Sequence, residues 1–171
     1  QLASNHDLES VLELITRSAS ELLGSEATAI WRYDDDLGGL SVIGGYNVPS
    51  DWAGSVFVNP GDGTTGQAFE TGQPVWSSNV QADPKWTFSD EGTETMSRAA
   101  RIGGALAVPI KIREKTFGVL NSFFYHTHEF TEGEVQLLQA LAASAAVAIA
   151  NAGFIEETQQ ARDDAEEANR T

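Results

Sequence analysis

The segment 104–125 constrains the fold more than any other part of the chain. Two strand-like runs, Gly104–Ile112 and Thr116–Tyr125, are joined by the charged turn Arg113-Glu114-Lys115. Apolar and β-branched runs separated by so short a turn predict an antiparallel hairpin. An isolated hairpin is only marginally stable in water, so the rest of the chain is expected to supply further strands and covering helices.

Helices are expected at both ends of the chain. Between Asp7 and Leu23, apolar residues recur three and four positions apart, which is the pattern of an amphipathic helix, and Gly24 can end it. After the hairpin, Thr131-Glu132-Gly133-Glu134 resembles a capping box, so the remaining residues are predicted to form one long helix.

Shorter elements are predicted between these helices: strands over 27–33, 40–46, 55–58 and 74–77, and helices over 64–71 and 93–101. This order predicts an α+β fold, with a mainly antiparallel sheet and the first and last helices packed on one face. Gly66 and Gly72 are interpreted as structural residues that fix the turn and the end of the 64–71 helix. The glycine-rich run 61–66 could also hold an anion with its backbone amides, but it lacks the lysine of a nucleotide-triphosphate loop.

Composition fits a single soluble module and excludes several kinds of chemistry. A chain of 171 residues can bury the core of one domain, and the absence of cysteine excludes disulfides, thiolate metal sites and cysteine nucleophiles. The net charge of −15 disfavours nucleic acid and anionic membrane surfaces as partners. No signal peptide opens the chain, and the apolar run Leu137–Ala150 is interrupted and too short to span a bilayer, so we expect a cytoplasmic module without membrane contact.

Two blocks in the middle of the chain resemble the signature of GAF domains. The first runs from Gly61-Asp62-Gly63-Thr64-Thr65-Gly66 through Gly72-Gln73-Pro74-Val75. The second is Ala105-Leu106-Ala107-Val108-Pro109-Ile110, followed by Phe117-Gly118-Val119-Leu120-Asn121, and Asp83-Pro84 lies between the two blocks. The resemblance covers about residues 8–152. It implies a six-stranded antiparallel sheet, with the terminal helices behind it and a small-molecule pocket on the other face.

The resemblance also allows some functions of the family to be set aside. Covalent bilin attachment and the methionine sulfoxide reductases built on this fold both need cysteine, which the chain lacks. Haem needs an axial ligand such as histidine, but His6, His126 and His128 are interpreted as ordinary exposed residues. We therefore expect no cofactor, no metal and no catalysis by this module.

Cyclic-nucleotide GAF domains carry a scattered Asn, Lys, Phe and Asp-Glu signature. Here Asn79, Lys85, Phe88 and Asp90-Glu91 follow in that order, but their spacing is more compressed than in the family. A cyclic nucleotide therefore remains a less favoured alternative.

Aromatic and polar residues near the expected pocket are the candidate ligand contacts. The segment 79–101 is expected to cover the pocket as a lid, Trp52 lies on the approach, and Ala105 and Ala107 leave space on the central strand. An anionic, partly aromatic ligand would suit arginine and tryptophan. The alternative is that the tryptophans fill the pocket themselves. The candidate contacts are Tyr46, Trp76, Trp86, Phe88, Met96, Arg98, Arg101 and Asn121.

The end of the chain is interpreted as a signalling helix. Residues 1–155 are assigned to the GAF sensory domain and 156–171 to a helix leading to an output domain. That polar helix resembles the segment which, in bacterial sensor histidine kinases, precedes the dimerisation helix, so the whole protein is expected to be such a kinase. A ladder that begins with Leu137 and Leu141, together with the first helix, favours a homodimer. The second hypothesis is a ligand-free dimerisation and spacer module.

Overall fold

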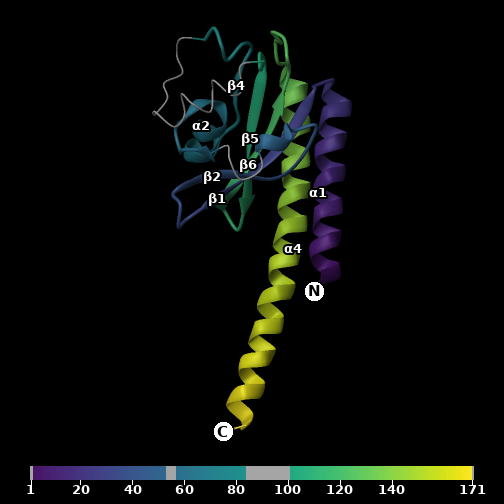
Figure 1. Cartoon of the computed structure of the whole chain (residues 1–171), viewed down its shortest axis with the longest axis vertical. Coiled ribbons are helices and arrows are strands. Elements are labelled where there is room, and N and C mark those ends of the chain that lie inside the picture. Colours follow the sequence, from purple (N-terminus) through teal and green to yellow (C-terminus); the bar gives the residue numbers. More distant parts are fainter. Residues whose placement is uncertain (1, 53–56, 84–100, 171) are drawn as a thin grey trace.

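The computed structural model describes residues 2–52, 57–83 and 101–170. Figure 1 shows its elements, and their order is largely the one predicted. The helices of this part are α1 (Leu2–Leu23), α2 (Gly63–Thr71), α4 (Glu132–Arg170) and the short 3-10 helix η1 (Ser50–Trp52). The strands are β1 (Ala27–Asp34), β2 (Gly39–Tyr46), β3 (Phe57–Val58), β4 (Val75–Ser77), β5 (Ala105–Ile112) and β6 (Lys115–Phe123).

The strands form one six-stranded sheet in the order β3-β2-β1-β6-β5-β4, and every neighbouring pair is antiparallel. The β5–β6 hairpin lies in the middle, and β6 continues the sheet by pairing with β1. This confirms the α+β fold with an antiparallel sheet. Residues 57–58 of the predicted strand 55–58 form β3, and residues 55–56 lie outside the described residues. The same holds for residues 93–100 of the predicted helix 93–101 and for most of the predicted lid 79–101.

The two faces of the sheet are covered by different helices. Figure 1 shows α1 and α4 side by side on one face and α2 on the other. Alternation along each strand separates the side chains: Ile30 and Leu106 pack beneath α1 and α4, whereas Ala29 and Ala107 face α2. The terminal helices therefore lie behind the sheet, as predicted, and the opposite face combines alanines such as Ala29 and Ala107 with the large side chains of Trp31 and Phe123.

The buried stripe of α4 is shifted by one position from the predicted apolar ladder, which begins with Leu137 and Leu141. Among residues 132–153 of the helix, the fully buried ones are Leu138, Ala142 and Ala145, whereas Leu137 and Leu141 lie at the flank and are half-buried. The reason is geometric, because α4 must contact the sheet and α1 at once, which turns a different stripe inward.

The apolar part of α4 is also longer than the sequence suggested. The segment Glu132–Gly153 is long and apolar enough to cross a membrane, so the expectation of a run too short to span was wrong on length. One stripe of this segment is packed against the core, which accounts for much of its apolar character. Beyond it, α4 continues to Arg170 and extends away from the domain (Figure 1), so residues 156–170 continue the same helix.

Gly72 and Gly66 are both required, but for different reasons. Gly72 ends α2 in the left-handed region, with φ of 67°, and its N–H donates to the carbonyl of Ala68. Gly66 lies inside α2, where a Cβ would come within 2.4 Å of the backbone oxygen of Asn59. Gly66 therefore permits a close approach of the 59–61 turn rather than forming a turn itself, which corrects its predicted role.

The capping box predicted for α4 is present. The N–H of Glu134 donates to the hydroxyl of Thr131 at 3.2 Å, and the carboxylate of Glu134 accepts the N–H of Thr131 at 2.9 Å. The same carboxylate lies 2.9 Å from Nε2 of His128. Partial burial acts to raise the pKa of Glu134, but the hydrogen bonds from Thr131 and His128 and the charge of His128 outweigh it and lower the pKa below its usual value.

We predict that Gly66→Ala and Gly72→Val each lower the free energy of unfolding by about 1–3 kcal/mol, through steric overlap and backbone strain respectively. Urea denaturation followed by circular dichroism measures the change. Gly153→Ala is the matched control, because no atom lies within 4 Å of the added Cβ. An unchanged stability of Gly72→Val would contradict the observed helix end.

We predict that Glu134→Gln costs about 0.5–1 kcal/mol at pH 7, because glutamine keeps the capping geometry but loses the charge beside His128 and the helix N-terminus. Since folding lowers the pKa of Glu134 below its ordinary value of 4.5, this contribution is present above pH 4.5 and is lost as the pH falls through the lowered pKa of the folded protein. Urea titrations of both proteins between pH 3 and 7 test this. A stability difference that persists undiminished at pH 3 would contradict it, and Glu132→Gln in the same turn is the control.

Candidate functional site

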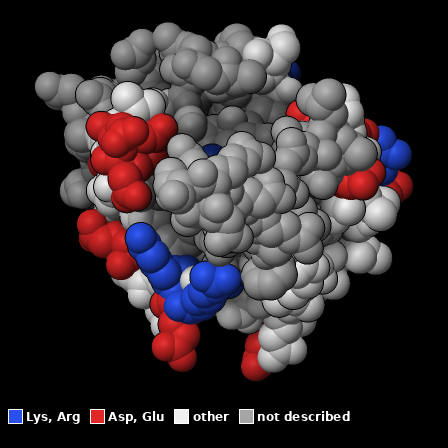
Figure 2. Space-filling model, turned by 90° about the horizontal axis from the view of Figure 1, so that it is seen from below, with Lys and Arg blue, Asp and Glu red and all other residues white. Residues whose placement is uncertain are grey.

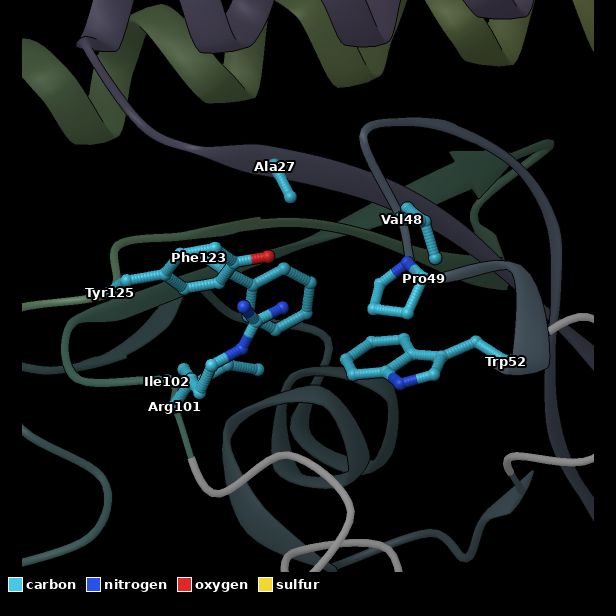
Figure 3. A pocket seen from close by; sticks show the side chains of 8 residues that line it. All are labelled: Ala27, Val48, Pro49, Trp52, Arg101, Ile102, Phe123 and Tyr125. Carbon is cyan, nitrogen blue, oxygen red and sulfur yellow. The ribbon is translucent and has the colours of Figure 1, made fainter.

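The candidate site is a cavity on the α2 side of the sheet (Figure 3). The sheet contributes Ala27 from β1 and Phe123 from β6. The remaining walls come from the β2–β3 connection and from the residues beside β5. The residues that line the cavity are Ala27, Val48, Pro49, Trp52, Arg101, Ile102, Phe123 and Tyr125.

Trp52 is the main wall of the cavity. Its ring centroid lies 5.6 Å from that of Phe123 in an edge-on arrangement and 6.1 Å from that of Trp31. The side chain is 5% exposed although it comes from η1, in the irregular connection between β2 and β3. A large aromatic ring from this connection thus fills part of the space on this face, between Trp31 and Phe123, and α2 covers β5 and β6 beside it.

Arg101 supplies the charge of the cavity. Its guanidinium lies 4.8 Å from the centroid of the Tyr125 ring, and Figure 3 shows it among the aromatic residues Tyr125, Phe123 and Trp52. A planar guanidinium held against an aromatic face retains donors for a carboxylate or phosphate. The cavity therefore combines one cation with three aromatic side chains.

The volume of this cavity is about 20 Å³, which is enough for a single water molecule. A metabolite can enter only if a wall residue moves. Trp52 belongs to a three-residue 3-10 helix within the connection between β2 and β3, so we take it as the wall residue whose movement would enlarge the cavity most.

The predicted contacts lie in different places. Arg101 lines the cavity, and Asn121 is buried on the same face of the sheet, where its amide donates to the hydroxyl of Thr65 in α2. Tyr46 instead lines a separate open cleft beside Glu21 and Glu26, with a volume of about 410 Å³.

Trp76 does not contribute to the cavity. It pairs with Leu106, which faces α1 and α4, and it is 46% exposed. The sequence placed it near the pocket, but alternation along β4 turns it to the opposite face. The other candidates, Trp86, Phe88, Met96 and Arg98, lie outside the described residues.

The histidines beside β6 have structural contacts. The His128 ring stacks on Phe124 with centroids 3.9 Å apart, and its Nε2 meets Glu134, while Nε2 of His126 lies 3.8 Å from Glu26. No group of three or more potential metal ligands occurs within the described part of the chain.

Sequence reasoning missed Phe123, Tyr125 and Ile102 as wall residues. One signal was available: residues two apart in a strand face the same side, so Phe123 had to lie on the face chosen for Asn121. No comparable signal existed for Val48 and Pro49, because they come from an irregular connection whose path the sequence does not specify.

Comparison with known proteins identifies the family. Residues 5–150 match the family model described as the GAF domain, so the chain belongs to the GAF family of sensory and regulatory modules. No protein with a curated description matches the sequence.

Several solved structures share the fold. The GAF domain of a phosphoenolpyruvate-protein phosphotransferase from Coxiella burnetii is 24% identical, with a TM-score of 0.73 over 88% of this chain and 86% of that one. A domain of a putative two-component sensor histidine kinase from Sinorhizobium meliloti 1021 is 16% identical, with a TM-score of 0.71 over 89% and 96%. Type II free methionine-R-sulfoxide reductase from Thermoplasma acidophilum is 15% identical, with a TM-score of 0.67 over 85% and 94%. The same fold thus serves proteins of different function.

We predict that Trp52→Ala lowers the free energy of unfolding by about 3–5 kcal/mol, because it empties the centre of an aromatic cluster. Trp76→Ala is the matched control and should cost less than about 1 kcal/mol, since that ring is half exposed. Chemical denaturation measures both. Equal losses for the two variants would contradict the buried position of Trp52.

Proposed function

We propose that this GAF domain is the sensory module of a multidomain bacterial signalling protein, a histidine kinase, and that it binds a small anionic, partly aromatic molecule. The observation that carries the proposal is the position of Arg101 among Trp52, Phe123 and Tyr125. These groups offer stacking surfaces beside one exposed cation that can donate hydrogen bonds. The kinase context is supported by the fold of the Sinorhizobium domain and by the continuous α4 helix, which runs out of the domain.

The cavity and the terminal helices are connected through the end of β6. Phe123 and Tyr125 line the cavity, and the chain then reaches the capping box of α4 within a few residues. On this proposal, a ligand that moves Trp52 or Arg101 favours one conformation of this turn and so shifts the start of α4. The module has no catalytic role of its own.

The second candidate function is a ligand-free dimerisation and spacer module. It is favoured by one observation, namely that Trp52 leaves a cavity of only about 20 Å³. The ligand-binding function therefore requires the Trp52 side chain to move out of the cavity wall, whereas the spacer function does not.

Binding is tested by a thermal-shift screen of aromatic and aliphatic carboxylates and phosphates, beginning with benzoate. We predict that a compound which stabilises the protein loses about tenfold or more in affinity in Arg101→Ala, as expected when one charge-assisted contact is removed. Arg32→Ala is the matched control, because Arg32 also lies against an aromatic ring, Phe117, at 5.6 Å. A broad screen without any shift would favour the spacer, and a hit that survives Arg101→Ala would exclude the anion contact.

We further propose that the module forms a homodimer through α1 and α4. Val11, Leu14 and Leu22 form an exposed apolar stripe on α1, with Leu14 and Leu22 more than 60% exposed, and Val147 on α4 is 60% exposed. Such a stripe on a helix is stabilised when a second copy covers it.

The partners expected for this protein follow from its charge. Figure 2 shows Asp and Glu in several separate groups around the end of the molecule from which α4 extends, and Lys and Arg mainly in one group. With a net charge of −15, the module is expected to avoid nucleic acid and anionic membranes and to act in the cytoplasm.

We predict that Leu14→Glu shifts the protein toward monomer in sedimentation velocity, because a charge would be buried in the dimer interface. Leu37→Glu is the control, since Leu37 is 67% exposed but lies in the β1–β2 turn. A wild-type protein that stays monomeric at high concentration would contradict the dimer for this chain.

A further inference from the structure

Two buried polar groups on the α2 side of the sheet have no hydrogen-bond partner. They are Nε1 of Trp31 and Oδ1 of Asn121, and they are the only such side-chain atoms in the described part of the chain. Trp31 is 2% exposed and Asn121 is 1% exposed. A buried polar group without a partner costs stability, so a water molecule or a ligand that hydrogen-bonds to these atoms would stabilise the folded protein.

The two groups lie next to each other on one face of the sheet. In the β1–β6 register Ala27 pairs with Phe123, Ala29 with Asn121 and Trp31 with Val119. Trp31 and Asn121 are therefore diagonal neighbours on adjacent strands. Ala29 and Ala107 flank Asn121 on either side, and neither side chain can supply a hydrogen bond.

Trp52 packs beside Trp31, which together with Asn121 we call the polar floor, and Thr65 of α2 contacts Asn121 from the same side of the sheet. The Trp52 ring packs against Trp31 at one end and Phe123 at the other, and the Ala29–Asn121 pair falls between those two residues along the strands. The cavity that holds Arg101 begins at Ala27 and Phe123, one pair further along. Trp52 thus contacts both the charged cavity, which it lines, and Trp31 of the polar floor.

The floor favours an uncharged group. The indole N–H of Trp31 can only donate a hydrogen bond. The amide nitrogen of Asn121 donates to the hydroxyl of Thr65, and its amide oxygen, which can only accept, has no partner. Asp62, at the start of α2, is the only buried charged residue in the regions that the structure covers. A charged group over Asn121 would therefore be buried without an opposite charge in this part of the chain.

We propose that Trp52 occupies the seat of a planar heterocycle, whose hydrogen-bonding edge satisfies Trp31 and Asn121 and whose other end lies toward Arg101. This inference rests on the proposed ligand-binding function and adds the chemical class of the inner half of the ligand: a neutral ring that carries both a hydrogen-bond acceptor and a donor. Trp52 leaves its seat by movement of η1, for which one backbone hydrogen bond is seen, from Trp52 N–H to the carbonyl of Pro49 at 3.0 Å.

The test uses quinolin-2-one, a neutral bicyclic lactam with one N–H and one carbonyl, and 1-methylquinolin-2-one, which lacks the N–H. Affinities are measured by ligand-observed NMR for the wild type, Trp52→Ala, Trp31→Phe and Asn121→Leu. We expect the unmethylated compound to bind more tightly than the methylated one, and more tightly still to Trp52→Ala, where the seat is empty. Trp31→Phe and Asn121→Leu should each weaken binding by about tenfold, the value of one hydrogen bond.

Several results would overturn the proposal. These are equal affinities for the two compounds, no loss in both floor variants, or no binding to either the wild type or Trp52→Ala. A crystal structure of Trp52→Ala soaked with the lactam that shows only an ordered water on the floor would do the same. If Asn121→Leu fails to fold, the affinity of Trp31→Phe for quinolin-2-one decides the test, because this variant keeps an aromatic ring.

Because the lactam is uncharged, its binding does not depend on the anion contact of Arg101. Arg101→Ala should therefore leave the affinity for quinolin-2-one within about twofold, as expected for a contact that the probe does not make. If the lactam binds and benzoate does not, the proposed anion site has failed and the heterocycle site stands. If benzoate binds and the lactam does not, the heterocycle site has failed and the anion site stands.

Discussion

The difference in side-chain size between the two faces of the central strands determines most of this structure. On the helix side, branched residues such as Ile30, Leu106 and Leu120 fill the space beneath α1 and α4. On the other side, Ala29 and Ala107 provide almost no volume next to Asn121. Protein interiors are close-packed, so this space must be filled by a side chain from elsewhere or by a ligand. α2 covers part of this space, with Thr65 against Asn121, and Trp52 fills the part next to Trp31 and Phe123. The small size of the cavity and the burial of a loop residue follow from this arrangement.

The sequence predicted those parts of the fold that depend on local patterns. Alternation and turn residues located the β5–β6 hairpin, the spacing of apolar residues located α1, and the Thr131–Glu134 motif located the start of α4. The sequence was less informative where tertiary contacts determine which face of the sheet a side chain takes or which loop residue is buried. A strand of three residues, such as β4, does not fix which face its middle residue takes, so Trp76 was assigned to the wrong side. Trp52 could not be recognised as a core residue, because no periodic pattern describes a ring that reaches the sheet from a loop.

One hydrogen-bonded turn connects the candidate site with α4. The N–H of Gly103 donates to the carbonyl of Phe124, and the N–H of Gly104 donates to that of His126, so the residues next to Arg101 are tied to the chain that follows β6. The N–H of His128 donates to Ser78, and its ring meets Glu134 at the α4 cap. A displacement at Arg101 or Phe123 can therefore reach α4 without passing through the sheet, provided that this turn has two accessible arrangements.

The central claim is that the filling of the α2-side cavity is coupled to the start of α4, and hydrogen exchange with mass spectrometry tests it most directly. Trp52→Ala is compared with Leu12→Ala, a core variant on the helix side of the sheet, with conditions adjusted so that both have the same global stability. The coupling predicts faster exchange in residues 101–104 and 124–134 of Trp52→Ala than of Leu12→Ala. Equal exchange of residues 124–134 in the two variants, with changes confined to the β2–β3 connection, would contradict it.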